Sequence, residues 1–189
     1  MKPIILVKIG GSLITDKTKA FSLKEEVLNL ICQEIRKASQ MGKWLIIGHG
    51  AGSFAHFPAA KYQTHKGIIN KQSYQGICEV ADVACQLNRI VVKKLIDNGV
   101  NAITMSPMGL MTAHEHKLKT ICLESLEETL RLNLLPVVYG DVILDTQVGC
   151  TIFSAEKVLG YIALELKRKG YKIEKIIHDI EEKLRYKGK

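Results

Sequence analysis

The stretch Ile4-Ile5-Leu6-Val7-Lys8-Ile9-Gly10-Gly11-Ser12 decides the fold. Its branched apolar residues are typical of a strand that is buried on both faces of a parallel sheet. Lys8 interrupts the run, and a lysine in a buried strand is costly unless it meets an anion. The two glycines permit turns in which successive backbone N–H groups bind an anion. The stretch therefore predicts a phosphate site at the carboxyl end of a first strand. An ordinary strand that ends in a flexible turn, with Lys8 at its edge, fits the same residues.

A second glycine-rich turn follows a second strand. Residues 23–40 have a helical pattern, and Ser22 and Glu25 have the spacing of a capping box before it. The strand at 44–47 then runs into Gly48-His49-Gly50-Ala51-Gly52-Ser53-Phe54-Ala55-His56. Strand, helix and strand in this order imply a parallel sheet, in which ligands bind beyond the carboxyl ends of the strands. We therefore expect both glycine-rich turns to lie at one edge of the sheet.

The rest of the chain predicts further elements of an α/β fold. The patterns favour helices over 73–98, 126–132 and 154–169, strands over 102–105, 135–139 and 175–177, and a hairpin from 143–145 to 149–152. Residues 110–122 are less regular. Within them His114-Glu115-His116 invites a metal site, but no third ligand lies nearby, so a surface loop is favoured and no metal-binding residue is predicted.

Composition limits the class of protein. Of the 189 residues 47% are apolar, which is enough for a sizeable core, and no apolar run is long enough to span a membrane. The chain does not start with a signal-peptide pattern. Its five cysteines are scattered and form no CxxC pair, which is typical of reduced thiols. These features predict a cytoplasmic protein that has no membrane partner.

The net charge of +8 is uneven, because residues 167–189 carry nine Lys/Arg against four Asp/Glu. A basic segment can indicate nucleic-acid binding. Here the basic residues alternate with acidic ones in a helix-like pattern. We therefore expect a solvated basic surface and no nucleic-acid partner.

Four segments together resemble the amino acid kinase superfamily and, within it, the isopentenyl phosphate kinase branch. They occur in the family's order, and they are Val7-Lys8-Ile9-Gly10-Gly11-Ser12-Leu13-Ile14-Thr15-Asp16-Lys17, the segment 49–56, Tyr139-Gly140-Asp141-Val142 and Gly149-Cys150-Thr151-Ile152-Phe153-Ser154. The first marks only the superfamily. The Gly-Ser-Phe-Ala-His segment narrows the resemblance to the branch, whose near relative phosphorylates the antibiotic fosfomycin. The resemblance implies a three-layer αβα sandwich with a mainly parallel central sheet, in which the N-terminal part binds the phosphate acceptor and the C-terminal part binds ATP.

The resemblance also implies roles for individual residues. The expected catalytic residues are Lys8, Lys17, His56 and Glu156. The expected substrate-binding residues are Gly10, Gly11, Gly50, Ala51, Gly52, Gly140 and Asp141. The expected ATP contacts are Lys8, Gly10, Ser12 and Asp179, and the cofactors are ATP and Mg²⁺.

The chain also departs from the family pattern. It has Ser154-Ala155-Glu156 where the family has Ser-Gly-Asp, and Ala55 where the family prefers glycine. Residues 176–182 stand where the family has a strand and then Thr-Asp-Val-Asp-Gly, so we expect the ATP half to be largely missing. This predicts an acceptor-binding domain over 1–170 and a vestige of the nucleotide-binding half with a basic tail over 171–189. A homodimer or a partner subunit is then expected to cover the missing half.

The implied function is ATP-dependent phosphorylation of a small phosphomonoester, namely isopentenyl phosphate to isopentenyl diphosphate, with low or no activity in the isolated chain. Such a reaction needs positioning and charge neutralisation, and the acceptor phosphate needs no general base. Two alternatives stay open. One is a non-catalytic remnant that binds a phosphorylated ligand, and the other is a phosphonate kinase of the fosfomycin type.

Overall fold

The computed structural model describes residues 2–16 and 18–178. Its helices are α1 (Gly11–Ile14), α2 (Glu25–Ser39), α3 (Gly52–Tyr62), α4 (Gln72–Asp97), α5 (Pro107–Leu110), α6 (Glu124–Arg131) and α7 (Ala155–Arg168), with a 3-10 turn η1 (Thr64–Lys66). Among the described residues, no helix is both long and apolar enough to cross a membrane.

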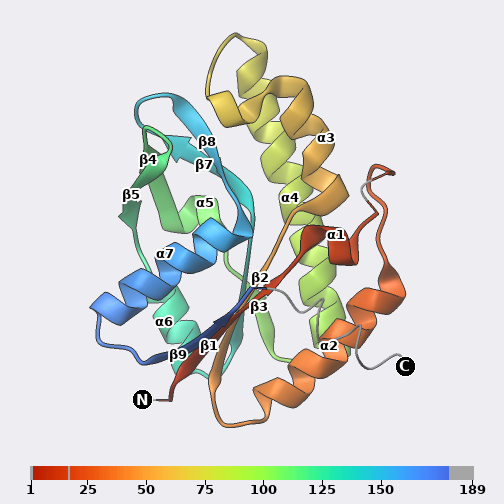
Figure 1. The fold of residues 1–189 in the computed structure, drawn as a ribbon, viewed down its shortest axis with the longest axis vertical. Helices are drawn as coiled ribbons and strands as arrows, with labels where there is room; N and C mark the ends of the chain where they lie inside the picture. Colours follow the sequence, from red (N-terminus) through yellow and green to blue (C-terminus); the bar gives the residue numbers. More distant parts are fainter. Residues whose placement is uncertain (1, 17, 179–189) are drawn as a thin grey trace.

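Five parallel strands form the central sheet in the order β3 (Ala102–Thr104), β6 (Leu135–Tyr139), β2 (Trp44–His49), β1 (Ile4–Ile9) and β9 (Ile173–Ile177) (Figure 1). In the register Lys8 pairs with Gly48, and His49 pairs with both Ile9 and Tyr139. The turns that follow β1, β2 and β6 therefore open at one edge of the sheet. This confirms the predicted parallel sheet with its glycine-rich turns on a shared edge.

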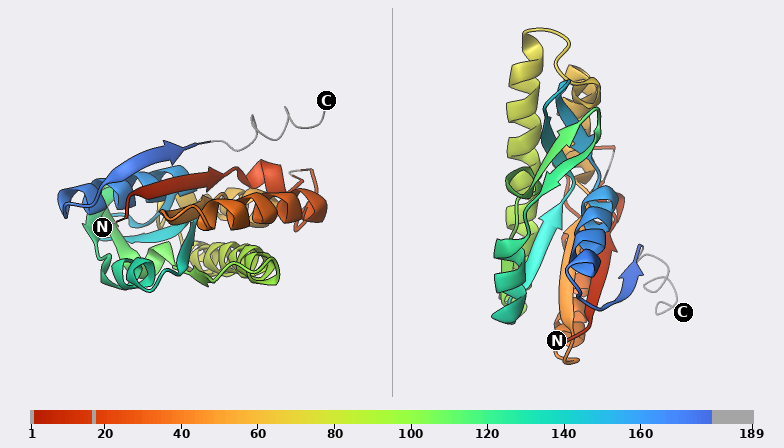
Figure 2. Two further views of the ribbon diagram at one scale, coloured as in Figure 1. Left: turned by 90° about the horizontal axis from the view of Figure 1, so that it is seen from below. Right: turned by 90° about the vertical axis from the view of Figure 1, so that its left-hand side faces the viewer.

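Side-chain alternation along the strands divides the core into two layers. Ile4 and Leu6 of β1 pack into the cluster that contains α6 and α7, whereas Val7 and Ile9 pack into the cluster that contains α2 and α4. The sheet thus lies between two helical layers, as the views in Figure 2 show. This is the predicted three-layer αβα sandwich. The same alternation places Lys8 on the α7 face of the sheet.

A second sheet of four strands was not predicted in full. It has the order β5 (Lys117–Ile121), β4 (Met111–His114), β7 (Asp141–Asp145) and β8 (Gly149–Phe153). The β7–β8 hairpin confirms the prediction, but the expectation that residues 110–122 are less regular is wrong, because residues 111–121 form the β4–β5 hairpin.

The β4–β5 turn has unusual residues for its conformation. Glu115 and His116 adopt φ angles of 49° and 62°, where hairpins usually place glycine or asparagine. The Asp145 carboxylate accepts hydrogen bonds from both backbone N–H groups, at 3.2 and 2.8 Å. The residues that invited a metal site therefore belong to a turn that Asp145 holds. The described residues contain no group of three or more potential metal ligands.

Helix α2 begins later than its sequence pattern predicts. Its first residue is Glu25, and Lys24 occupies the cap position without a side-chain hydrogen bond, so the predicted capping box at Ser22 is wrong. The reason lies in the preceding chain, where Leu23 forms an antiparallel bridge with Thr15. The Lys24 N–H donates to the Ile14 carbonyl at 2.8 Å, which keeps this segment extended beside the first glycine-rich turn.

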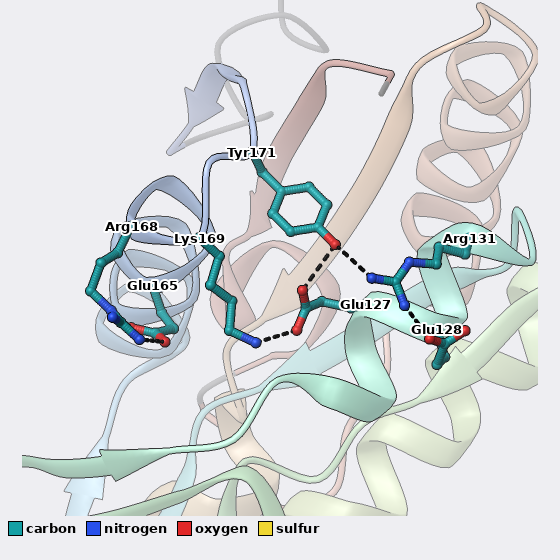
Figure 3. Close-up of polar contacts among 7 residues, drawn as sticks. All are labelled: Glu127, Glu128, Arg131, Glu165, Arg168, Lys169 and Tyr171. Carbon is teal, nitrogen blue, oxygen red and sulfur yellow. Dashed lines mark hydrogen bonds and ion pairs between the residues drawn. The ribbon is translucent and has the colours of Figure 1, made fainter.

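A polar cluster joins α6 to the end of α7 on the face opposite α2 (Figure 3). The Glu127 carboxylate is 8% exposed, and it accepts hydrogen bonds from Lys169 and, at 2.9 Å, from the Tyr171 hydroxyl. Arg131 donates to the same hydroxyl at 3.4 Å and also pairs with Glu128. Glu165 and Arg168 form a separate pair on α7.

Candidate phosphate-binding site

A cleft of about 440 Å³ opens at the carboxyl edge of the central sheet. It is bounded by the turns after β1, β2 and β6, by α3 and α4, and by the end of β8. Most of the residues that the sequence singled out line it. Its lining consists of Lys8, Gly10, Gly11, Ser12, Gly50, Ala51, Gly52, Ala55, His56, Ala59, Val80, Gly140, Asp141, Ile152, Phe153, Ser154 and Ala155.

The two glycine-rich turns lie directly against each other. A Cβ atom on Gly11 would lie 2.6 Å from the Gly52 nitrogen, and one on Gly50 would lie 2.8 Å from the Gly11 nitrogen. Gly52 also has a φ of +51°, which favours glycine. Thr15 ties the turns together, because its hydroxyl donates to the Gly11 carbonyl at 2.7 Å and accepts from the Ser53 N–H at 3.0 Å. Only residues without side chains allow this approach.

Four backbone N–H groups where the turns meet have no acceptor among the described residues. The N–H groups of Gly11, Ser12, Ala51 and Gly52 donate no hydrogen bond to any residue within 2–16 or 18–178. Each of them precedes or begins a helix, where backbone N–H groups lack intrahelical acceptors. All four residues line the cleft. Such a set of N–H groups suits the oxygens of an anion.

Lys8 brings a positive charge to the base of this edge. Its ammonium group lies 3.3 Å from the Glu156 carboxylate in the first turn of α7, and only 21% of the Lys8 side chain is exposed. Ser154 caps α7 by accepting from the Lys157 N–H at 3.3 Å. The other Glu156 oxygen lies 3.9 Å from the Nδ1 atom of His178. Glu156 is thus an ion-pair partner of Lys8.

Asp141 is the buried acid of the cleft. The residue is 3% exposed, and its carboxylate accepts a hydrogen bond from the Val142 N–H at 2.8 Å. Burial raises the pKa of this carboxyl to about 7, although the backbone hydrogen bond from Val142 opposes the shift. Asp141 can therefore hold a proton near neutral pH.

Of four other residues predicted for the site, two line the cleft and two lie outside the described residues. His56 lies on α3 with an exposed side chain and lines the cleft, next to the edge of the Phe57 ring. Gly140 lines the cleft where β6 ends. Lys17 and Asp179, predicted as a catalytic lysine and an ATP contact, lie outside the described residues.

The cleft also has an apolar wall. Its lining includes Val80 of α4, Ala55 and Ala59 of α3, and Ile152 and Phe153 of β8. Through Val80, the helix that the sequence predicted over 73–98 contributes to this lining. The cleft thus has backbone N–H groups and Lys8 in one part and apolar side chains in another, which matches a ligand with an anionic head and a small apolar tail.

Sequence reasoning missed a buried histidine behind the second glycine-rich turn. His49 is fully buried; its Nδ1 atom lies 3.2 Å from the Gly50 carbonyl oxygen, and its Nε2 atom lies 3.0 Å from the Asn88 amide nitrogen on α4. Burial lowers the pKa of His49 to about 4, although the contact with Gly50 opposes this shift. The alternation along β2 could have placed His49 on the same face as Leu45 and Ile47, which α2 and α4 cover, but no spacing in the sequence pairs it with Asn88.

Comparison with known proteins agrees with this geometry. Residues 3–171 match the amino acid kinase family. Isopentenyl phosphate kinase of Methanocaldococcus jannaschii is 29% identical over 174 residues, and that of Methanothermobacter thermautotrophicus is 30% identical over 170 residues. The matches cover 87% and 86% of this chain but 65% and 63% of those relatives, so the chain spans slightly less than two thirds of their length.

A solved structure of isopentenyl phosphate kinase has the same fold. It superposes with a TM-score of 0.82 at 29% identity, and the match covers 92% of this chain and 70% of that one. The sequence match extends over the first β strand, both glycine-rich turns and the cleft. The chain therefore belongs to the amino acid kinase family.

Proposed function

We propose that the chain binds isopentenyl phosphate in the cleft and transfers the γ-phosphoryl group of ATP to it, which yields isopentenyl diphosphate and ADP. The observation that carries this proposal is the convergence of four free backbone N–H groups with Lys8 beside an apolar wall. The related isopentenyl phosphate kinases supply the identity of the acceptor. Because the chain spans less than two thirds of their length, the activity itself is part of the proposal.

The proposed chemistry requires no general base. An oxygen of the acceptor phosphate attacks the γ-phosphorus, the bond from that phosphorus to the bridging oxygen breaks, and ADP leaves with the electron pair. Negative charge accumulates on the transferring group, so the protein's task is to position the reactants and to neutralise this charge. We assign neutralisation to Lys8 and to the N–H groups of the two turns, and contact with the acceptor phosphate to His56. Glu156 orients Lys8.

The rest of the cleft supports the choice of acceptor. Gly10, Gly50 and Gly140 let the backbone approach the phosphates, and Asp141 can stay protonated beside an anion near neutral pH. The apolar wall at Val80 and Ile152 would receive the isoprenoid tail. Lys17 as a second lysine at the transferring phosphoryl group, and Asp179 as an ATP contact, are proposed from the family resemblance alone.

The residues of the turns fit a nucleotide phosphate as well as an acceptor phosphate. A Cβ atom at Gly11 would fill the space between the turns, and Lys8 and Ser12 lie beside it. ATP would supply the phosphoryl group. The described residues offer no cluster of three metal ligands, so Mg²⁺ would be held mainly by phosphate oxygens, as is common for this ion.

The expected compartment is the cytoplasm. All five cysteines are free, and Cys32 and Cys150 are buried, whereas Cys78 and Cys122 are exposed. Exposed thiols persist in a reducing compartment. This supports the proposed location.

The test mixes the purified chain with magnesium, labelled ATP and isopentenyl phosphate, and it measures the labelled diphosphate product. We expect slow turnover that Lys8→Ala abolishes and that Lys37→Ala, a change at an exposed lysine of α2, leaves intact. Running the assay at several protein concentrations tests for the proposed homodimer, because specific activity would then rise with concentration. Product that forms equally well with Lys8→Ala would contradict the proposed site.

The same experiment separates the two other functions. Binding of isopentenyl phosphate in calorimetry without any turnover would identify a phosphate-binding module. Turnover with fosfomycin in place of isopentenyl phosphate would identify a phosphonate kinase. A chain that binds none of these ligands and turns none of them over would contradict the proposal as a whole.

A further inference from the structure

His49 lies directly behind the second glycine-rich turn, on the α4 face of the sheet. Its ring is fully buried, stacks on Tyr139 with ring centroids 5.9 Å apart, and contacts two polar partners. One partner is the carbonyl oxygen of Gly50, a residue that lines the cleft. His49 itself does not line the cleft, so any role in phosphate binding must act through the backbone of the turn.

The two partners determine which nitrogen of His49 carries the proton. The Gly50 carbonyl can only accept, so Nδ1 must be the N–H donor. A fully buried imidazole is neutral, so Nε2 carries no proton and accepts a hydrogen bond from the Asn88 amide. The reverse orientation of the Asn88 amide would require protons on both ring nitrogens. The Gly50 carbonyl therefore selects the Nδ1–H form of the ring, and Asn88 complements this form by donating to Nε2.

Burial of the Asn88 side chain lowers the stability of the fold. This residue is fully buried, and its Oδ1 atom has no hydrogen-bond partner. A buried acceptor without a partner destabilises the fold. The contact with His49 is the one hydrogen bond that the described residues give to the Asn88 side chain, which ties this costly residue to the orientation of the ring.

Fixing the Gly50 carbonyl also fixes the next N–H group. In a trans peptide the C=O and the following N–H point in opposite directions. Because the Gly50 oxygen is held toward His49 in the interior, the Ala51 N–H points to the other side of the turn. Ala51 lines the cleft, and its N–H has no acceptor among the described residues.

We propose that His49, oriented by Asn88, is a positioning residue that holds the Gly50–Ala51 peptide with its N–H directed at a phosphate oxygen in the cleft. The inference rests on the proposed function for the presence of that phosphate. The buried pair of His49 on β2 and Asn88 on α4 then holds the turn in its binding conformation before the ligand arrives. Preorganised donors of this kind need no rearrangement when they meet the charge.

The test compares three variants in calorimetric titrations with isopentenyl phosphate. His49→Leu removes the donor, and we expect about tenfold weaker binding. His49→Asn keeps a donor near the Nδ1 position and should restore most of the affinity. Val92→Ala, a buried change on α4 outside the cleft lining, should lower the melting temperature without weakening binding.

Two results would overturn the inference. One is binding by folded His49→Leu that is as tight as that of the natural chain, and the other is binding by His49→Asn that is as weak as that of His49→Leu. The second would assign the effect to ring volume and not to the donor.

Nitrogen NMR of the ligand-free natural chain provides an independent measurement that needs no variant. We expect the His49 ring to be in the Nδ1–H form, and the Nε2–H form would overturn the inference. If the natural chain binds neither isopentenyl phosphate nor inorganic phosphate, the proposed function fails, while the NMR result still decides the contact between His49 and Gly50.

Discussion

Lys8 illustrates how far a single residue could be understood from the sequence. A charged residue in an apolar strand predicted an anion site, and alternation along β1 determined which face of the sheet carries it. The structure adds that Glu156 lies 3.3 Å from the ammonium group. That partner was expected only from the family resemblance, because it lies far along the chain and on another element.

His56 is the residue to change first in the cleft. We expect His56→Ala to weaken the binding of isopentenyl phosphate by about 1.5–3 kcal/mol, the range for a hydrogen bond to a charged group. Calorimetry at fixed salt measures the change. His65→Ala is the matched control, because His65 is an exposed histidine on η1 that does not line the cleft. Unchanged affinity in His56→Ala would remove this residue from the site.

Asp141 predicts how stability varies with pH. Its carboxyl has an ordinary pKa near 3.8 when unfolded and a pKa of about 7 when folded, so the folded chain retains the proton over this interval. Stability should therefore fall as pH rises from about 4 to about 7 and stay reduced above that pH. Asp141→Asn removes the effect, and we expect it to be more stable than the natural chain at pH 8 by on the order of 4 kcal/mol.

Urea unfolding at several pH values measures this difference. At pH 4 the two proteins should differ little in their free energy of unfolding, because the Asp141 carboxyl is then neutral in the folded state and only about half ionised in the unfolded state. If the difference in free energy of unfolding between Asp141→Asn and the natural chain is the same at pH 4 and at pH 8, Asp141 ionises normally in the folded protein.

At the scale of elements, the β4–β5 hairpin shows why part of the fold escaped prediction. Hairpin turns are recognised from glycine, asparagine or aspartate at positions with positive φ. Here Glu115 and His116 occupy those positions, and Asp145 on another hairpin stabilises them. A contact between distant segments thus replaces the local turn residues. The strands β1, β2 and β6 were predicted because their own apolar runs suffice to identify them.

The cluster that joins α6 to α7 yields a prediction for stability. Burial opposes ionisation of Glu127, but the hydrogen bonds from Lys169 and Tyr171 and the charges of Lys169 and Arg131 together lower its pKa below the ordinary 4.5. Glu127→Gln should therefore cost about 2 kcal/mol of the free energy of unfolding at pH 7. The difference should shrink as pH falls below about 4.5, because the depressed pKa stabilises the fold only while the carboxylate is ionised.

Glu128→Gln is the matched control for this change. Glu128 is the next residue of the same helix, and its side chain is 62% exposed in its pair with Arg131. Exposed pairs contribute little, so we expect a change of less than about 0.5 kcal/mol. Equal effects of the two substitutions in urea unfolding at pH 7 would show that the cluster does not join α6 to α7.

At the scale of the whole molecule, parallel topology is what creates the site. Strands β1, β2 and β6 are neighbours in the sheet and point the same way, so three turns from distant parts of the chain meet at one edge. This convergence could be predicted from the repeated order of strand, glycine-rich turn and helix. The depth of the cleft could not, because it depends on how α3 and α4 pack beside β8.

The central claim is that the two glycine-rich turns form a single phosphomonoester site, and Gly11 tests it most directly. A Cβ atom at Gly11 would lie 2.6 Å from the Gly52 nitrogen, so Gly11→Ala must push the turns apart. Gly109→Ala is the control, because its Cβ atom would meet no atom within 4 Å. The measurement is a calorimetric titration of both variants and the natural chain with isopentenyl phosphate. The account predicts binding by the natural chain and by Gly109→Ala and at least about tenfold weaker binding by Gly11→Ala; equal affinity for all three proteins, or no binding by the natural chain, would contradict it.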